Sequence, residues 1–332
     1  MKAIVNNEYG LPDVLKFEEV ETPTPKDNEV LIKVYAAAAN VGDWFFLTGK
    51  PFMVRLDPGG LRKPKTTILG SDVAGRVEAV GKGVTQFQIG DDVYGDLSNS
   101  GLGAFAEYVT APENVITHKP ENLSFAEAAA VPTSGVTALQ GIRDHGGIQP
   151  GQKVLINGAS GGVGTFAVQI AKSYGTEVTA VCSTGKMELV RSIGADHVID
   201  YNKEDFAQNG QLYDLIIGVN GTHSLSDYKQ ALNSEGTYVC IGGTVPHIFQ
   251  SMILGPLMSK KAGKTIKGMG SVKINQKDLI VMKTLLEAGT VVPVIDHCFP
   301  LNETDEAFRY LGKGHAKGKV VITVLQANEA GI

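Results

Sequence analysis

The spacing of apolar positions changes about a third of the way along the chain. Before residue 120, apolar residues form short runs at 30–34, 73–80 and 105–109, with glycine turns between them. Such runs predict a compact, mostly β domain. From about residue 123, apolar strand, glycine turn and amphipathic helix alternate, which is typical of βαβ units around a parallel sheet. The expected strands of this sheet are residues 153–157, 177–181, 197–199, 215–219 and 237–241.

The last stretch of the chain differs from the βαβ region before it. Residues 303–311 predict one amphipathic helix and residues 319–325 one β-strand, which we expect to return to the first domain. We therefore predict an α/β protein with domains at 1–122 and 123–294 and a return segment at 295–332. A length of 332 residues, 43% of them apolar, exceeds one hydrophobic core and agrees with two domains.

One segment has no regular pattern. Residues 51–65 are rich in Pro, Gly and basic side chains, and an irregular loop of this length is often functional or mobile. Its role stays open.

Charge and cysteine content exclude several classes of protein. The 30 basic and 35 acidic residues give a formal charge of −5, which argues against binding to nucleic acid or anionic lipid. No apolar segment approaches the roughly 20 residues of a membrane span, and the N-terminus lacks a signal-peptide core. Cys182, Cys240 and Cys298 are too scattered for a disulfide framework. We expect a soluble, cytoplasmic protein with buried, reduced cysteines.

The strongest local motif is a glycine turn between the strand at 153–157 and an amphipathic helix. Ala159-x-Gly161-x-x-Gly164 matches the dinucleotide-binding fingerprint with alanine in the first position. In that motif the second glycine lets the backbone approach a pyrophosphate, and the third lets helix and strand pack closely. The free N–H groups at the start of the helix attract the phosphates. The predicted phosphate-binding residues are Ala159, Ser160, Gly161, Gly162, Val163 and Gly164. A purely structural glycine turn is the alternative.

The end of the next strand indicates which dinucleotide is bound. Enzymes that prefer NAD carry an acidic residue about 20 positions after the glycines, where it binds the ribose 2′-hydroxyl. This chain has Ser183 there and Lys186 shortly after. A hydroxyl and an ammonium suit the 2′-phosphate of NADP(H), which a carboxylate would repel. The alternative, that Lys186 is an ordinary solvated helix residue, stays open.

Several motifs together resemble a known family. They are residues 40–49, residues 70–77, Gly81, residues 90–93, residues 131–140 and the glycine turn at 158–164. In this order they resemble the medium-chain dehydrogenase/reductase superfamily and, within it, the zinc-free quinone oxidoreductase branch. The resemblance covers nearly the whole chain. It implies a GroES-like, mostly β domain with a Rossmann doubly wound parallel sheet, and a homodimer.

The zinc ligands of the superfamily are missing at both of its metal sites. Where zinc-dependent members have a Cys followed by Asp, and a Gly-His-Glu, this chain has Asn40-Val-Gly-Asp43 and Gly70-Ser71-Asp72. It has no Cys before residue 182, so the four-cysteine lobe is absent too. Zinc requires Cys, His or carboxylate ligands in tetrahedral arrangement, so we expect no metal.

Without zinc to polarise a carbonyl, hydride transfer requires a substrate that is already electrophilic. A quinone or an α,β-unsaturated carbonyl meets this requirement, with hydrogen bonds stabilising the developing oxyanion. The resemblance implies the same substrate class. It also implies that Asn40 lies by the nicotinamide, that Lys186 and Tyr201 bind the 2′-phosphate, and that Gly242, Gly243 and Met269 line the nicotinamide end.

The chain departs from the branch at one position of the substrate pocket. Quinone reductases often have Tyr two residues after the Asp of the Asn-x-x-Asp motif, whereas here Asp43 is followed by Trp44 and Phe45. The pocket wall is then apolar, and the polar candidates are Asn40, Asp43, Ser71 and Thr137. Two alternatives stay open: Asp43 orders its own turn, and Trp44, Phe45 and Phe46 belong to the core.

Three functions are compatible with these features. The leading one is an NADPH-dependent reductase of quinones or enones. The second is an alcohol or aldehyde dehydrogenase, although no zinc or Tyr/Lys proton relay is visible. The third is a non-catalytic NADPH-binding sensor or scaffold. Steady NADPH consumption with a small quinone separates the first from the third.

Overall fold

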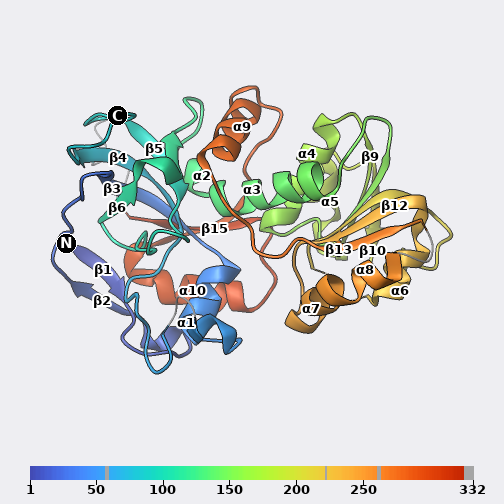
Figure 1. Ribbon diagram of the computed structural model, residues 1–332, viewed down its shortest axis with the longest axis horizontal. Helices are drawn as coiled ribbons and strands as arrows, with labels where there is room; N and C mark the ends of the chain where they lie inside the picture. Colours follow the sequence, from blue (N-terminus) through green and yellow to red (C-terminus); the bar gives the residue numbers. More distant parts are fainter. Residues whose placement is uncertain (57–59, 221–222, 260–262, 325–332) are drawn as a thin grey trace. The chain divides into compact units, whose positions relative to one another are not determined.

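The computed structural model describes residues 1–56, 60–220, 223–259 and 263–324, which form two compact units (Figure 1). The first unit contains Met1–Thr133, Ile274–Glu287 and Pro293–Ile332, and the second contains Ser134–Lys273 and Ala288–Val292. This division into compact units does not test the predicted domain boundaries at 122/123 and 294/295, which stay a prediction. Residues 57–59 of the irregular loop and residue 325 of the last predicted strand lie outside the described residues.

The first unit is built on a largely antiparallel sheet. Across the described residues its strand order is β14-β15-β3-β4-β5-β7, and β6 pairs with β3. The strands are β3 (Glu29–Ala39), β4 (Asp72–Val80), β5 (Asp92–Asp96), β6 (Tyr108–Pro112), β7 (Ile116–His118), β14 (Ile295–Pro300) and β15 (Lys319–Thr323), with a separate pair β1 (Lys2–Val5) and β2 (Lys16–Glu19). The helices are α1 (Val41–Thr48), α2 (Phe125–Ala129), α9 (Gln276–Glu287) and α10 (Thr304–Gly312).

Alternating burial along β3 explains the core of this unit. Val30, Ile32 and Val34 are fully buried, whereas the residues between them are half-buried, as expected for one covered face of a sheet. Phe308 of α10 packs edge-on against Phe105 with ring centroids 5.8 Å apart. The last segment of the chain therefore packs onto the core of the first unit, and the mostly β, GroES-like domain is confirmed.

The second unit is the predicted Rossmann sheet. Its strands are all parallel and, in the part of the chain that the structure describes, number six in the order β10-β9-β8-β11-β12-β13. They are β8 (Lys153–Asn157), β9 (Glu177–Cys182), β10 (His197–Asp200), β11 (Tyr213–Gly218), β12 (Leu232–Cys240) and β13 (Thr265–Gly268). The helices are α3 (Pro132–Gln140), α4 (Gly162–Ser173), α5 (Met187–Ser192), α6 (Leu225–Gln230), α7 (Val245–Ile253) and α8 (Gly255–Ser259).

The order of these strands places a binding edge. Val154, Leu155 and Ile156 in β8 are fully buried, as in a parallel sheet that is covered on both faces. The chain runs outward from β8 through β9 to β10, and then returns to the other side of β8 at β11. This reversal is a topological switch point, and ligands of such sheets bind at the carboxyl ends of the strands beside it.

Candidate functional site

The glycine turn lies at this switch point, directly after β8. Gly161 is the N-cap of α4, with an extended backbone and no capping side chain, so the first N–H groups of the helix have no side-chain acceptor there. A Cβ on Gly164 would lie 2.1 Å from the Gly158 carbonyl oxygen, whereas a Cβ on Gly161 would meet only that oxygen, at 3.9 Å. Gly164 thus permits close packing and Gly161 keeps the open side of the turn free. This geometry fits a dinucleotide pyrophosphate.

The two glycines predict opposite consequences of adding one methyl group. Gly164→Ala should lower the free energy of unfolding by about 1–3 kcal/mol, because the backbone of the turn at Gly158 and Ala159 must move away. Gly161→Ala should leave stability within about 1 kcal/mol, since its φ of −88° suits alanine. It should nevertheless weaken cofactor binding. Urea unfolding and cofactor titration of both variants check this, and equal destabilisation by the two would contradict it.

Three predicted cofactor residues come together at the ends of β9 and β10. Asp200 is in register with Cys182, and the Tyr201 N–H donates to the Cys182 carbonyl oxygen at 3.1 Å. Ser183 follows Cys182, and the Lys186 N–H donates to the Ser183 carbonyl oxygen at 2.9 Å. Tyr201, Ser183 and Lys186 are therefore neighbours at one edge of the sheet.

Asp200, which the sequence analysis did not single out, supports this corner. Its carboxylate accepts hydrogen bonds from the Thr184 hydroxyl at 2.5 Å and the Asn202 N–H at 3.1 Å. The bond from Thr184 is the main reason that the pKa of Asp200 lies below its ordinary value. The carboxylate thus ties the turn after β9 to the turn after β10.

The other predicted cofactor residues follow β12 and β13 at the same edge. The Gly242 N–H donates to the Gly218 carbonyl oxygen at 3.1 Å, and Gly243 has a φ of +123° that favours glycine. The Met269 N–H donates to the Cys240 carbonyl oxygen at 2.9 Å, and its side chain is buried. The three groups of predicted cofactor residues therefore follow one another along the carboxyl ends of the strands: the residues after β9 and β10, the glycine turn after β8, and the residues after β12 and β13.

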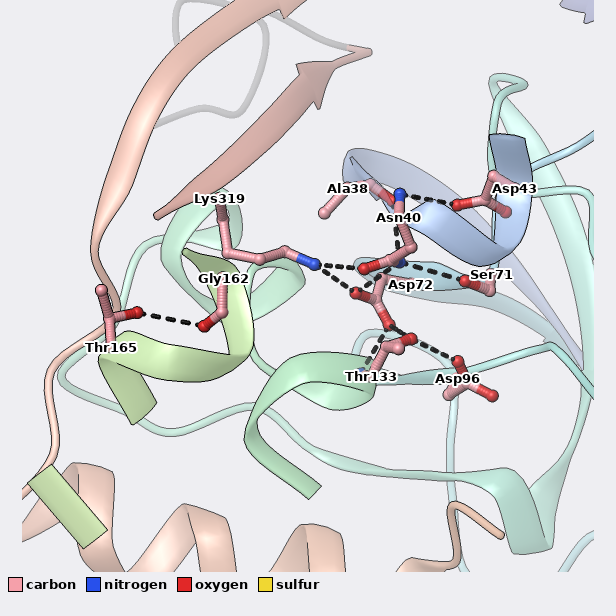
Figure 2. Close-up of polar contacts among 10 residues, drawn as sticks. All are labelled: Ala38, Asn40, Asp43, Ser71, Asp72, Asp96, Thr133, Gly162, Thr165 and Lys319. Carbon is pink, nitrogen blue, oxygen red and sulfur yellow. Dashed lines mark hydrogen bonds and ion pairs between the residues drawn. The ribbon is translucent and has the colours of Figure 1, made fainter. Parts of the chain in front are cut away.

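The first unit contains a second candidate site, a largely buried polar cluster at one end of four adjacent strands. We define this polar cluster as Asn40, Asp43, Ser71, Asp72, Asp96, Thr133 and Lys319 (Figure 2). The antiparallel registers explain it: Asp72 pairs with Ala38 and Asp96, and Val320 pairs with Ala39. The start of β15, the end of β3, the start of β4 and the end of β5 therefore coincide. Of its members, the sequence analysis identified only Asn40, Asp43 and Ser71 as candidates.

Asp72 is the centre of the polar cluster. It is fully buried, and both its oxygens accept two hydrogen bonds. One oxygen accepts from the Thr133 N–H at 2.8 Å and the Thr133 hydroxyl at 2.6 Å. The other accepts from the Asn40 side-chain amide at 3.0 Å and the Lys319 ammonium at 3.1 Å. Four donors, one of them an ammonium, compensate the cost of burying this side chain.

The Thr133 hydroxyl lies between the Asp72 and Asp96 carboxyls. Its oxygen lies 2.6 Å from Asp72 and 2.8 Å from Asp96, but a hydroxyl has one proton to donate. Both contacts can be hydrogen bonds at once only when one of the two carboxyls carries a proton. Burial, followed by the charge of Asp72, raises the pKa of Asp96, which favours a proton on this carboxyl.

The two carboxyl oxygens of Asp43 differ in their hydrogen bonding. Oδ2 accepts from the Asn40 N–H at 2.9 Å, so the carboxyl does order the first turn of α1. Oδ1 is buried and has no hydrogen-bond partner among the described residues. Burial is the largest cause that raises the pKa of Asp43 to about 7, and the charges of Asp72 and Asp96 act in the same direction.

The predicted pocket residues have different surroundings. Trp44 packs onto the core of the first unit, its ring 6.4 Å from that of Phe308, which agrees with the core interpretation for this residue. Phe45 is half-buried. Thr137 lies on α3 and is buried. That Trp44, Phe45 and Thr137 line a substrate pocket stays a prediction.

No helix in the described residues is long and apolar enough to cross a membrane. The same residues contain no group of three or more His, Cys, Asp or Glu side chains placed to hold a metal ion.

Comparison with known proteins agrees with both units. Residues 26–121 match the alcohol dehydrogenase GroES-like domain, and residues 193–322 match the family described as zinc-binding dehydrogenase. The chain is 37% identical to the 2-methylene-furan-3-one reductase of Solanum lycopersicum, over 97% of this chain and 79% of that protein. It is 35% identical to the chloroplastic NADPH-dependent alkenal/one oxidoreductase of Arabidopsis thaliana, with the same coverage.

A solved structure extends this similarity to the fold. The quinone oxidoreductase from Coxiella burnetii is 31% identical and has a TM-score of 0.86, covering 98% of this chain and 99% of that one. The resemblance inferred from the motifs is thus confirmed. The chain is an oxidoreductase that belongs to the medium-chain dehydrogenase/reductase superfamily, in its quinone oxidoreductase-like branch.

Proposed function

We propose that this protein is an NADPH-dependent reductase of quinones or α,β-unsaturated carbonyls that works without a catalytic zinc. The observation that carries the proposal is the row of groups along the carboxyl edge of the parallel sheet, with Ser183 and Lys186 where an NAD-specific fold has a carboxylate. The activities printed for the relatives support the substrate class.

Each unit has a separate part in the proposed reaction. Bound NADPH would supply the hydride. The second unit holds the cofactor through the glycine turn at 159–164, the corner at Ser183, Lys186 and Tyr201, and the end at Gly242, Gly243 and Met269. The first unit supplies Asn40, Asp43 and Ser71 as polar groups for the substrate. Reduction places negative charge on the substrate oxygen, and oriented donors stabilise that charge.

The test is a panel of small quinones, enones, aldehydes and simple ketones, followed by the loss of NADPH absorbance. We expect conjugated substrates to be reduced with a kcat/KM at least about a hundredfold above that of simple ketones. An apolar wall near Phe45 offers few groups to stabilise an alkoxide that is not conjugated. Comparable efficiency on simple ketones and quinones would contradict the proposal, as would oxidation of alcohols with NADP⁺.

The absence of catalytic zinc gives a further prediction. The purified protein should contain well under one equivalent of zinc, and a chelator should leave its activity unchanged, because Asn40 and Ser71 stand where zinc ligands would be required. Elemental analysis before and after dialysis against chelator checks this. Stoichiometric zinc that is lost together with activity is the contrary result.

We also propose a homodimer and a cytoplasmic location. β13 is the last strand in the order of the Rossmann sheet, and the neighbouring helices α7 and α8 expose Phe249, Ile253 and Leu257. A second copy at this edge would cover an apolar surface that monomers rarely expose. Sedimentation and cell fractionation test the two proposals.

A further inference from the structure

Lys319 is a buried lysine that neither the glycine motif nor the substrate candidates include. Only 3% of its surface is exposed. Its ammonium donates to Asn40 Oδ1 at 2.5 Å and to Asp72 Oδ2 at 3.1 Å (Figure 2). Lysine is almost never fully buried unless it is paired, since removing a charge from water is costly. The contacts with Asp72 and Asn40 compensate that cost.

Lys319 and Asp72 together fix the orientation of the Asn40 amide. Asn40 Oδ1 faces the ammonium, and Nδ2 faces Asp72 Oδ2 at 3.0 Å. Turning the amide over would place NH₂ against the ammonium and the amide oxygen against the carboxylate. Both contacts would be repulsive, so one orientation is selected.

The orientation of Asn40 in turn decides what Ser71 can do. Asn40 Nδ2 shares its two protons among Asp72 Oδ2, Ser71 Oγ at 3.2 Å and the Ala38 carbonyl oxygen at 3.3 Å, and in the contact with Ser71 the serine oxygen is the acceptor. A hydroxyl has one proton, and within the described part of the chain that proton has no acceptor. The arrangement therefore leaves the Ser71 O–H as a donor for an oxygen atom of a ligand.

We propose that Lys319 is a positioning residue for carbonyl reduction: it holds the Asn40 amide so that the Ser71 hydroxyl donates to the carbonyl oxygen of the substrate. The inference rests on the proposed function. During hydride addition the carbonyl oxygen gains negative charge, and a hydroxyl already turned toward it needs no reorganisation. Lys319 itself contacts neither substrate nor cofactor in this role.

The first test removes the charge at residue 319. Lys319→Met keeps the length of the side chain and should lower kcat by about a hundredfold, the loss expected when a reacting group is misplaced by about 1 Å. The dissociation constant for NADPH should change by less than about twofold, because the proposed contacts with its pyrophosphate and 2′-phosphate lie in the second unit. Lys313→Met, at an exposed lysine of the first unit, is the matched control.

The second test asks whether Lys319 acts through the proposed partners. In the double variant Lys319→Met with Asp72→Asn, neither residue 319 nor residue 72 leaves an unpaired charge in the polar cluster. Its kcat should therefore be about tenfold above that of Lys319→Met alone. The double variant Ser71→Ala with Lys319→Met should have a kcat only slightly below that of the less active single variant, because both substitutions act on one interaction. If Lys319→Met does not fold, the neutral double variant replaces it and should keep a kcat about tenfold below wild type.

The outcomes separate this inference from the proposed function. A wild-type protein that reduces no quinone or enone overturns the proposed function, and the positioning role with it. If the wild type is active, a kcat of Lys319→Met within twofold of wild type overturns the positioning role alone. Three further results would also overturn the positioning role alone. In the first, a lower folded fraction of Lys319→Met fully explains its loss of kcat. In the second, the double variant Lys319→Met with Asp72→Asn has the kcat of wild type, and in the third, the effects of Lys319→Met and Ser71→Ala on kcat are fully additive.

Discussion

Replacing Lys186 by Ala is expected to weaken NADPH binding by about ten- to a hundredfold and to leave NADH binding almost unchanged. Only NADPH carries the 2′-phosphate, so a group that binds this phosphate affects one cofactor and spares the other. Lys186 lies in the turn that follows β9, next to Ser183 and close to Tyr201 after β10. A charge-assisted hydrogen bond at a partly exposed site contributes about 1.5–3 kcal/mol, which gives the expected factor.

Ser183→Asp tests the same corner in the opposite sense. The new carboxylate would repel the 2′-phosphate and could accept a hydrogen bond from the 2′-hydroxyl of NADH, so the preference should move toward NADH.

Dissociation constants for both cofactors at one fixed ionic strength measure these two effects, because salt screens exposed charges. Lys153→Ala, an exposed lysine at the opposite end of β8, is the matched control for loss of one positive charge. If Lys186→Ala weakens both cofactors equally, or neither, the assignment of the 2′-phosphate to this corner is wrong.

Local patterns predicted the elements of the second unit well. β8 spans the predicted residues 153–157, because its apolar run ends directly at a glycine turn. β12 begins at Leu232, before the predicted residue 237, because Asn233, Ser234 and Glu235 join the strand. These polar residues lie where the register with β11 shifts, between Leu232 and Thr237, and bring no alternation of apolar side chains. A hydrophobic pattern therefore could not include them.

The two candidate sites were not equally predictable. The glycine turn is a local motif, and its strand and helix are neighbours in sequence. The polar cluster depends on strand register, which joins Lys319 to Asp72 across 247 positions. The available signal was a charged residue directly beside an apolar strand, as for Asp72, Asp96 and Lys319. Many exposed strand ends have a charged residue in the same place. This pattern alone could therefore not identify the polar cluster before the fold was known.

The buried Asp43 carboxyl should make the first unit less stable as the pH rises from about 4 to about 7. Burial raises the pKa of Asp43 from 3.8 to about 7. Below pH 4 both the folded and the unfolded chain hold this proton, so its contribution to stability is fully present. Above pH 4 the unfolded chain releases the proton first, and the contribution is lost as the pH passes the folded pKa. About three pKa units correspond to roughly 4 kcal/mol of unfolding free energy.

Asp43→Asn removes this titration and isolates its effect. The amide oxygen can still accept the Asn40 N–H, and nothing at residue 43 then changes charge. At pH 8 the variant should be more stable than wild type by up to about 4 kcal/mol, and the two should converge near pH 4. A smaller fall with pH should remain in the variant, because the pKa of Asp96 is raised for the same reason.

Urea unfolding between pH 4 and pH 8, followed by tryptophan fluorescence, measures this difference. The chain has one tryptophan, Trp44, which packs onto the core of the first unit beside Asp43, so the signal reports on that unit even if the two units unfold separately. Asp27→Asn, at an exposed aspartate of the same unit, controls for the loss of one negative charge and should follow the wild-type pH dependence. Parallel curves for wild type and Asp43→Asn would mean that Asp43 titrates near its ordinary pKa in the folded protein. The carboxyl would then be solvated, and the buried, unpartnered Oδ1 on which the prediction rests would be wrong.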